Sequence, residues 1–118
     1  MVLKLALACI ATAMSAVVVL ADDPAGRYSL RGTNPGSGSA YSGTVVVERT
    51  GDTFRVTWDV GRQTFVGTGI GTSDGLAVSY RSGNQTGLAI YGPKGPNWEG
   101  VWTYTGGQQV GTEVWTRR

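Results

Sequence analysis

The sequence is short of the residues that most enzyme and metal sites need. It has one cysteine, Cys9, and no histidine. Without a histidine there is no Ser-His-Asp triad and no Cys-His pair, and an ordinary zinc or haem site is also excluded. Lys94 is the only lysine after Lys4, and its place in a Gly-Pro turn argues against a buried Schiff-base lysine. We therefore expect a non-enzymatic protein with no metal and no cofactor.

The first 21 residues have the pattern of a secretory signal peptide. Lys4 is the only charge before Asp22, residues 5–20 form an apolar run, and the small residue Ala21 precedes the expected cleavage point. The run is shorter than the roughly 20 residues that span a bilayer. We predict a signal peptide at 1–21 and one domain at 22–118. The mature protein is expected to be secreted or periplasmic, with no stable membrane insertion after cleavage.

From residue 27 onward, short strand-like runs alternate with turn residues. Phe54, Val56 and Trp58 alternate with polar neighbours, which is the period of a half-buried strand. Gly, Asn, Asp and Pro clusters separate the runs, and no window has a sustained helical period. The predicted strands are 27–33, 40–49, 53–60, 64–71, 76–81, 86–91, 97–104 and 109–116.

The short connections decide how these strands are arranged. Parallel neighbours need a crossover of about a dozen residues or more, and no connection is long enough. A meander of eight strands leaves two unpaired edges unless the sheet closes. We predict an all-β, eight-stranded antiparallel up-and-down barrel, with a two-sheet sandwich or a bent open sheet as the alternative. Gly67, Gly69 and Gly71 share one face and predict a tight bend covered by aromatic rings, with a ligand groove as the alternative.

The glycine and aromatic pattern also resembles a known group of proteins. It runs through Tyr41-Ser42-Gly43, Trp58, Phe65-Val66-Gly67-Thr68-Gly69, Gly100-Val101-Trp102 and Gly111-Thr112-Glu113. These segments resemble small exported proteobacterial proteins, mostly uncharacterised, some of which are labelled fibronectin-binding protein. More distantly, the layout resembles the avidin-like and lipocalin-like meander barrels. The resemblance implies an exported barrel, and its label implies adhesion to an extracellular protein.

Two carboxylates on the last two predicted strands are candidates for chemistry. Glu99 and Glu113 could form an acid–base pair of the kind that hydrolyses glycosides. Glu113 shares a strand face with Trp115, opposite Val114. If the tryptophan side faces the core, Glu113 needs an arginine or hydroxyl partner, because an isolated buried charge is very costly. Arginine candidates are Arg55 and Arg81. We favour the opposite orientation, with Glu113 on the surface.

Aromatic side chains supply the candidate ligand site. Trp98, Trp102 and Tyr104 share one face of a predicted strand, and this stripe could stack on a sugar ring or line a barrel mouth. We expect the open end of the barrel near Trp98 and Tyr91. For Trp102 we favour a core position over a ligand contact, and we assign Trp58 and Tyr80 to the core. The candidate ligand-binding residues are Trp98, Trp102, Tyr104, Tyr91, Glu113, Arg55 and Arg81.

Three functions remain open. The first is a binding protein for a small or carbohydrate-like ligand, and the second is a protein-interaction or adhesion module with an extracellular partner. The third is a carboxylate-dependent hydrolase. Basic and acidic residues nearly balance, at 10 and 8, so we expect no nucleic-acid partner. We favour the binding protein.

Overall fold

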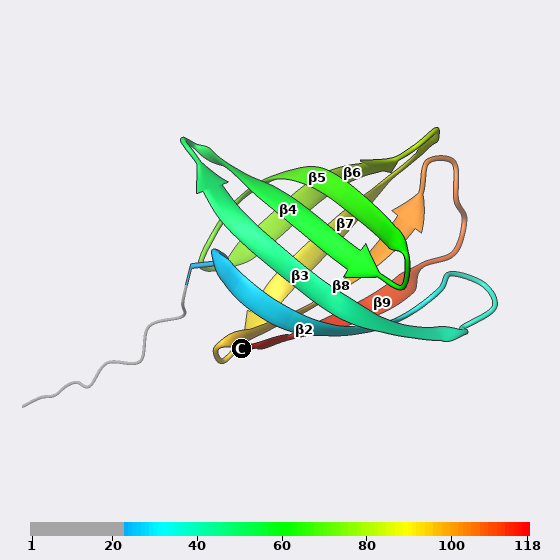
Figure 1. The fold of residues 1–118 in the computed structure, drawn as a ribbon, viewed down its shortest axis with the longest axis horizontal. Coiled ribbons are helices and arrows are strands. Elements are labelled where there is room, and N and C mark those ends of the chain that lie inside the picture. Colours follow the sequence, from blue (N-terminus) through cyan, green and yellow to red (C-terminus); the bar gives the residue numbers. More distant parts are fainter. Residues whose placement is uncertain (1–22) are drawn as a thin grey trace, which may run out of the picture.

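The computed structural model describes residues 23–118, and the predicted signal peptide lies outside the described residues. These residues form a closed barrel of antiparallel strands in chain order, drawn in Figure 1. No helix long and apolar enough to cross a membrane occurs in this part of the chain. The strands are β2 (Gly26–Thr33), β3 (Ala40–Thr50), β4 (Thr53–Val60), β5 (Gln63–Thr72), β6 (Gly75–Ser82), β7 (Gln85–Lys94), β8 (Asn97–Tyr104) and β9 (Gly111–Arg117).

Pairing of the first and last of these strands closes the barrel. Tyr28 of β2 pairs with Arg117 of β9, and the register continues to the pair Thr33 and Thr112. The predicted meander barrel is therefore confirmed, and the sandwich and open sheet are excluded. The largest boundary error concerns the strand predicted at 86–91: β7 continues through Pro93, which pairs with Trp98, to Lys94. The turn needs only Gly95 and Pro96, because Gly95 adopts a positive φ of 61°. The last strand also begins at Gly111 rather than at 109.

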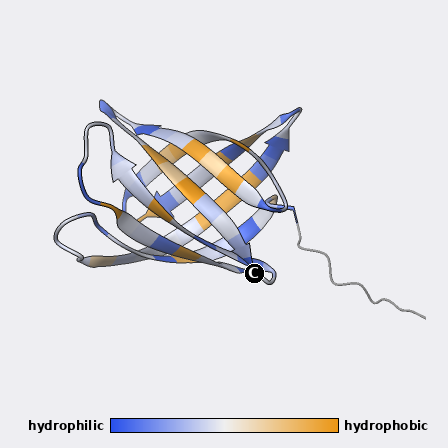
Figure 2. Cartoon of the chain, turned by 180° about the vertical axis from the view of Figure 1, so that it is seen from behind, coloured by the Kyte–Doolittle hydropathy of each residue, from blue (hydrophilic) through white to orange (hydrophobic). Residues whose placement is uncertain are grey.

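Side chains alternate between the barrel interior and its outer wall. On β9 the buried positions are Gly111, Glu113 and Trp115, and the residues between them are exposed. Figure 2 shows the same alternation as apolar and polar segments along the strands, with polar residues at the turn tips. The interior forms one hydrophobic cluster that is rich in aromatic rings. This alternation decides which side chains can line a cavity.

Inward-facing glycines give the aromatic rings their positions. A methyl group at Gly100 would lie 2.5 Å from the Tyr91 ring, and one at Gly87 would lie 2.4 Å from the Tyr80 hydroxyl. In each case the ring belongs to the residue paired with that glycine on the neighbouring strand. Gly67 likewise lies under Trp58. The expected ring cover is therefore confirmed for Gly67 alone: aliphatic Leu76 and Val78 lie nearest to Gly69, and backbone atoms of residues 75 and 76 lie nearest to Gly71.

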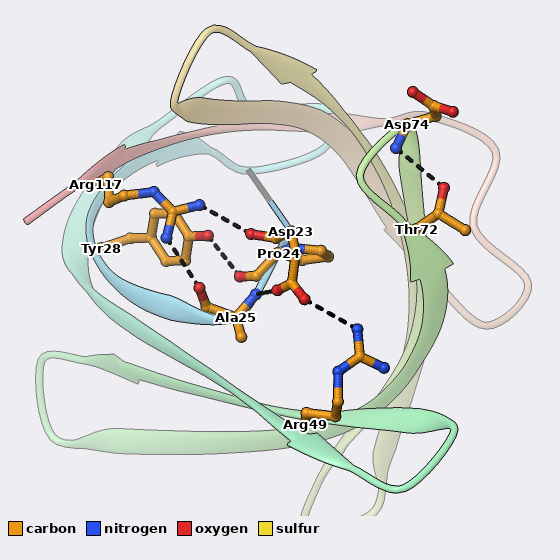
Figure 3. Close-up of polar contacts among 8 residues, drawn as sticks. All are labelled: Asp23, Pro24, Ala25, Tyr28, Arg49, Thr72, Asp74 and Arg117. Atoms are coloured by element: carbon orange, nitrogen blue, oxygen red, sulfur yellow. Dashed lines mark hydrogen bonds and ion pairs between the residues drawn. The ribbon is translucent and has the colours of Figure 1, made fainter. Parts of the chain in front are cut away.

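A short segment closes the end of the barrel where the described chain begins. Pro24 is fully buried and accepts a hydrogen bond from the Tyr28 hydroxyl through its carbonyl oxygen, at 2.5 Å. The Arg117 guanidinium donates to the carbonyl oxygens of Ala25 (2.9 Å) and Asp23 (3.0 Å). Figure 3 shows Asp23, Pro24 and Ala25 inside the ring of strands, held by these contacts and by Arg49. We call residues 23–25 the strap.

The outer wall carries several exposed apolar side chains. Ile70, Ala77, Ile90 and Val101 are successive cross-strand neighbours from β5 to β8. Ile70 and Ile90 are 62% and 60% exposed. The wall itself has no unpaired strand edge among the described strands. Any protein partner of this domain would therefore contact side chains, since strand addition needs a free edge.

Candidate functional site

The end of the barrel opposite the strap holds a pocket of about 360 Å³. It lies where β3, β5, β7 and β9 begin and β2, β4, β6 and β8 end, at the right-hand end of the barrel in Figure 1. This volume lies within the usual range for small-molecule sites. The lining residues are Asn34, Tyr41, Trp58, Val60, Gln63, Phe65, Tyr80, Ser82, Gln85, Ala89, Tyr91, Trp102, Tyr104 and Glu113.

Glu113 lies in the wall of this pocket and accepts four hydrogen bonds. Its Oε1 atom accepts from the Tyr91 hydroxyl (2.8 Å) and from the Nε1 atoms of Trp115 (3.0 Å) and Trp58 (3.1 Å). Its Oε2 atom accepts from the Tyr41 hydroxyl at 2.6 Å. An indole nitrogen can only donate, so the arrangement suits an ionised carboxylate that acts as acceptor alone. The side chain is 6% exposed.

The favoured prediction for Glu113 was wrong. We expected it on the surface with Val114 inward, whereas Glu113 and Trp115 face the interior and Val114 is 39% exposed. The proposed arginine partners were also wrong: Arg55 and Arg81 are exposed on β4 and β6, at positions that alternate with buried ones. Hydroxyl and indole donors take the place of a cation because aromatic residues occupy the inward positions around Glu113.

The charge of Glu113 therefore has no cationic partner in the described part of the chain. Ion pairs there join Arg49 to Asp23 and Lys94 to Glu99, and the side chains of both pairs are well exposed. Glu113 is also the only charged residue among those that line the pocket. Neutral donors lower the cost of burying the carboxylate, but they leave its net charge in place.

The tyrosines beside Glu113 are held in their neutral form. Burial and the negative charge of Glu113 raise the pKa values of Tyr41 and Tyr91 well above the ordinary value of a phenol. Burial, together with Tyr104 and Glu113, raises the pKa of Tyr80 to about 12. At neutral pH these hydroxyls therefore keep their protons. Tyr41 and Tyr91 can then serve as permanent donors to the carboxylate.

Aromatic rings around the pocket stand at steep angles to one another. Trp102 makes edge contacts with Tyr41 (78°), Tyr80 (71°) and Tyr104 (78°), with ring centroids 5.2–6.2 Å apart. Phe65 meets Tyr80 at 78°. The buried indole N–H of Trp102 has no hydrogen-bond acceptor within residues 23–118. The Nε1 atom lies beside Gly111, where an added Cβ would be 2.7 Å from it.

The structure brings together four of the seven predicted site residues. Trp102, Tyr104, Tyr91 and Glu113 all line the pocket. Trp98 does not: it is 1% exposed and lies near the start of β8, at the strap end. The expectation of an open end near Trp98 was therefore wrong. β8 runs the full length of the barrel, so Trp98 and Trp102 share a face but approach opposite ends.

Glu99 and Glu113 cannot act as a pair across one substrate in this structure. Glu99 is exposed on the outer face of β8 and lies 3.8 Å from Lys94, whereas Glu113 faces the interior. The barrel wall separates the two carboxylates. A glycosidase of the usual kind needs both carboxylates on the same bound sugar.

Sequence reasoning missed several pocket residues. Tyr41 and Phe65 were noted only within the resemblance, and Trp58 and Tyr80 were assigned to the core. The polar rim residues Asn34, Gln63, Ser82 and Gln85 were not identified. One usable signal was present. Several inward glycines, among them Gly32, Gly87 and Gly100, are paired with a tyrosine on the neighbouring strand whose ring covers them.

Comparison with known proteins does not identify a family for this chain, so its class is described from its fold and its pocket. No protein-family model matches the sequence, and no curated protein matches it significantly. The class defined by the structure is a closed eight-stranded meander barrel with an aromatic pocket at one end.

Proposed function

We propose that this chain is an exported, non-enzymatic binding protein that holds a small ligand in the pocket at the open end of the barrel. The observation that carries the proposal is the pocket of about 360 Å³, with seven aromatic side chains in its lining and polar side chains at its rim. Aromatic faces supply apolar contact, and the polar groups orient a ligand. The protein-interaction hypothesis stays a prediction, and it would use the outer wall.

A substitution that fills the pocket tests this proposal. Ala89 is buried and lines the pocket, so Ala89→Leu places three additional carbon atoms in the ligand volume. Ala77→Leu is the matched control, because Ala77 is exposed on the neighbouring strand β6. Ligands are first found by thermal shift against sugars, amines, alcohols and fatty acids, since a ligand specific for the folded state raises the melting temperature.

We expect Ala89→Leu to weaken the binding of a ligand from this screen about tenfold or more. Ala77→Leu should leave its affinity within about twofold of the unmodified protein. Equal affinity in both variants would place the ligand outside the pocket. A folded protein that responds to no member of the screen would contradict the proposal.

A further inference from the structure

We infer that the ligand of this pocket is a small organic monocation, an ammonium or guanidinium compound held between aromatic faces beside the Glu113 carboxylate. This inference rests on the binding function proposed above and specifies its ligand class. It combines two independent features of the pocket, the unpaired charge of Glu113 and the arrangement of the rings around it.

The first feature is the charge balance of the pocket. Glu113 contributes a full negative charge to a narrow, low-dielectric interior, and the described lining has no lysine or arginine to offset it. In such a cleft a single charge acts on ligands more strongly than it would at an open surface. A cationic ligand would supply the missing counter-charge. An anionic ligand would be repelled and would find no basic group in the lining.

The second feature is the ring arrangement. The faces of aromatic rings carry partial negative charge and attract cations within about 6 Å, most strongly for tryptophan. Trp102 meets Tyr41, Tyr80 and Tyr104 at 71–78°, so neighbouring rings form walls at nearly right angles. Walls of this kind enclose a compact cation from several sides. A sugar instead stacks on one broad aromatic face, and it needs several polar side chains to hydrogen-bond its hydroxyl groups.

The bonding of Glu113 leaves room for a ligand on one side. Oε1 already accepts three hydrogen bonds, from Tyr91, Trp58 and Trp115. Oε2 accepts one, from Tyr41, whose side chain is part-buried in the pocket lining. A carboxylate oxygen offers about two acceptor positions. By this count Oε2 keeps one acceptor position for a ligand N–H, while a quaternary ammonium would be held by charge and ring contact alone.

A purely structural role for Glu113 is the competing explanation. The carboxylate joins donors from β3, β4, β7 and β9 and could serve only to fix their side chains. That role would make the protein depend on Glu113 for stability but would give it no preference for ligand charge. Charge preference at constant ligand shape is therefore the measurement that separates the two roles.

The experiment compares choline with 3,3-dimethylbutan-1-ol, its neutral isostere with carbon in place of nitrogen, by calorimetric titration of the purified protein. n-Butylammonium is the second cation and separates primary from quaternary ammonium recognition. We expect at least one of the two cations to bind about tenfold or more tightly than the isostere. Glu113→Gln should reduce this preference to about twofold or less.

Two further variants keep the test decisive if Glu113→Gln fails to fold. Trp102→Leu removes a ring that makes no hydrogen bond to Glu113 and should reduce the cation preference several-fold. Glu99→Gln removes an equal charge from the outer wall, where it is 3.8 Å from Lys94, and should leave the preference unchanged. An effect of Glu99→Gln as large as that of Trp102→Leu would overturn the inference.

Failure of this inference differs from failure of the proposed function. If the neutral isostere or a neutral sugar binds as tightly as both cations, and Ala89→Leu abolishes that binding, the pocket binds ligands but the cation inference is overturned. If no cation and no member of the wider screen binds the folded protein, both are overturned.

Discussion

The two ends of this barrel are built from the same kinds of residue, but one end is packed solid and the other holds a pocket. At the strap end, Trp98, Trp115 and Tyr28 are at most 1% exposed and pack into a solid core. At the open end, rings of the same types surround a pocket of about 360 Å³. The strap end has Pro24 inserted between the strands, whereas the open end has only polar rim residues. Both ends are rich in aromatic rings, so aromatic content does not distinguish them. The difference between the filled end and the hollow end is the presence of the strap.

The largest expected effect breaks the filled end. Trp98→Ala would leave a cavity in tightly packed surroundings and should lower the free energy of unfolding by about 3–5 kcal/mol. Trp102→Ala should cost less, because the Trp102 ring already borders an empty volume. Urea unfolding of both variants measures the difference. Equal losses would show that the two ends are packed alike, contrary to the structure.

A smaller effect tests how glycines place the rings. A methyl group at Gly100 would lie 2.2 Å from the Ile90 carbonyl oxygen and 2.5 Å from the Tyr91 ring. Gly100→Ala should therefore destabilise the protein by about 1–3 kcal/mol. Gly92, on the neighbouring strand β7, has no atom within 4 Å of such a methyl group. Gly92→Ala should change stability by no more than about 0.5 kcal/mol, measured in the same way.

The smallest expected effect concerns alkaline pH at the open end. Tyr80 has a pKa of about 12 in the folded protein, against an ordinary value of 10.0. Between these values the unfolded chain loses the Tyr80 proton and the folded protein keeps it. The resulting stabilisation is therefore fully present below pH 10 and is lost as the pH rises through about 12. Urea unfolding between pH 9 and 12 should show this decline.

Tyr80→Phe is the control for the alkaline effect. Its hydroxyl makes only a long hydrogen bond, 3.4 Å, to the Thr103 carbonyl oxygen, so the variant should fold. We expect a shallower decline of stability with pH in this variant. An identical decline would assign the effect to the other tyrosines, Tyr41 and Tyr91, whose pKa values are raised further.

Sequence reasoning predicted the fold more fully than the site, and the reason lies in the range of the interactions. Alternation along strands such as residues 53–60 and the short turns are local properties, and together they required an antiparallel meander. The orientation of β9 is not local. Both of its faces are apolar in sequence, with Val114 on one and Trp115 on the other, and only the pairing with β2 and β8 places Glu113 inside.

The position of Trp98 was unpredictable for a related reason. The inward orientation of Trp98 follows from the strand pattern. Which end of the barrel is closed, however, depends on where the strap binds. The strap is held by Arg117, from the far end of the described chain. No local pattern connects residues 23–25 with residue 117. The aromatic stripe of Trp98, Trp102 and Tyr104 was therefore predicted as one site although it serves two ends.

Closure by β2 and β9 also has a consequence for how the protein folds. Residues 28–33 cannot pair with residues 112–117 until all the strands between them have been synthesised. Contacts between such distant parts of a chain make folding slow, since the loop entropy is lost before the contact forms. Glu113 lies on the closing strand, and its donors lie mostly on strands made earlier. We therefore expect the hydrogen bonds around Glu113 to be complete only once β9 has closed the barrel.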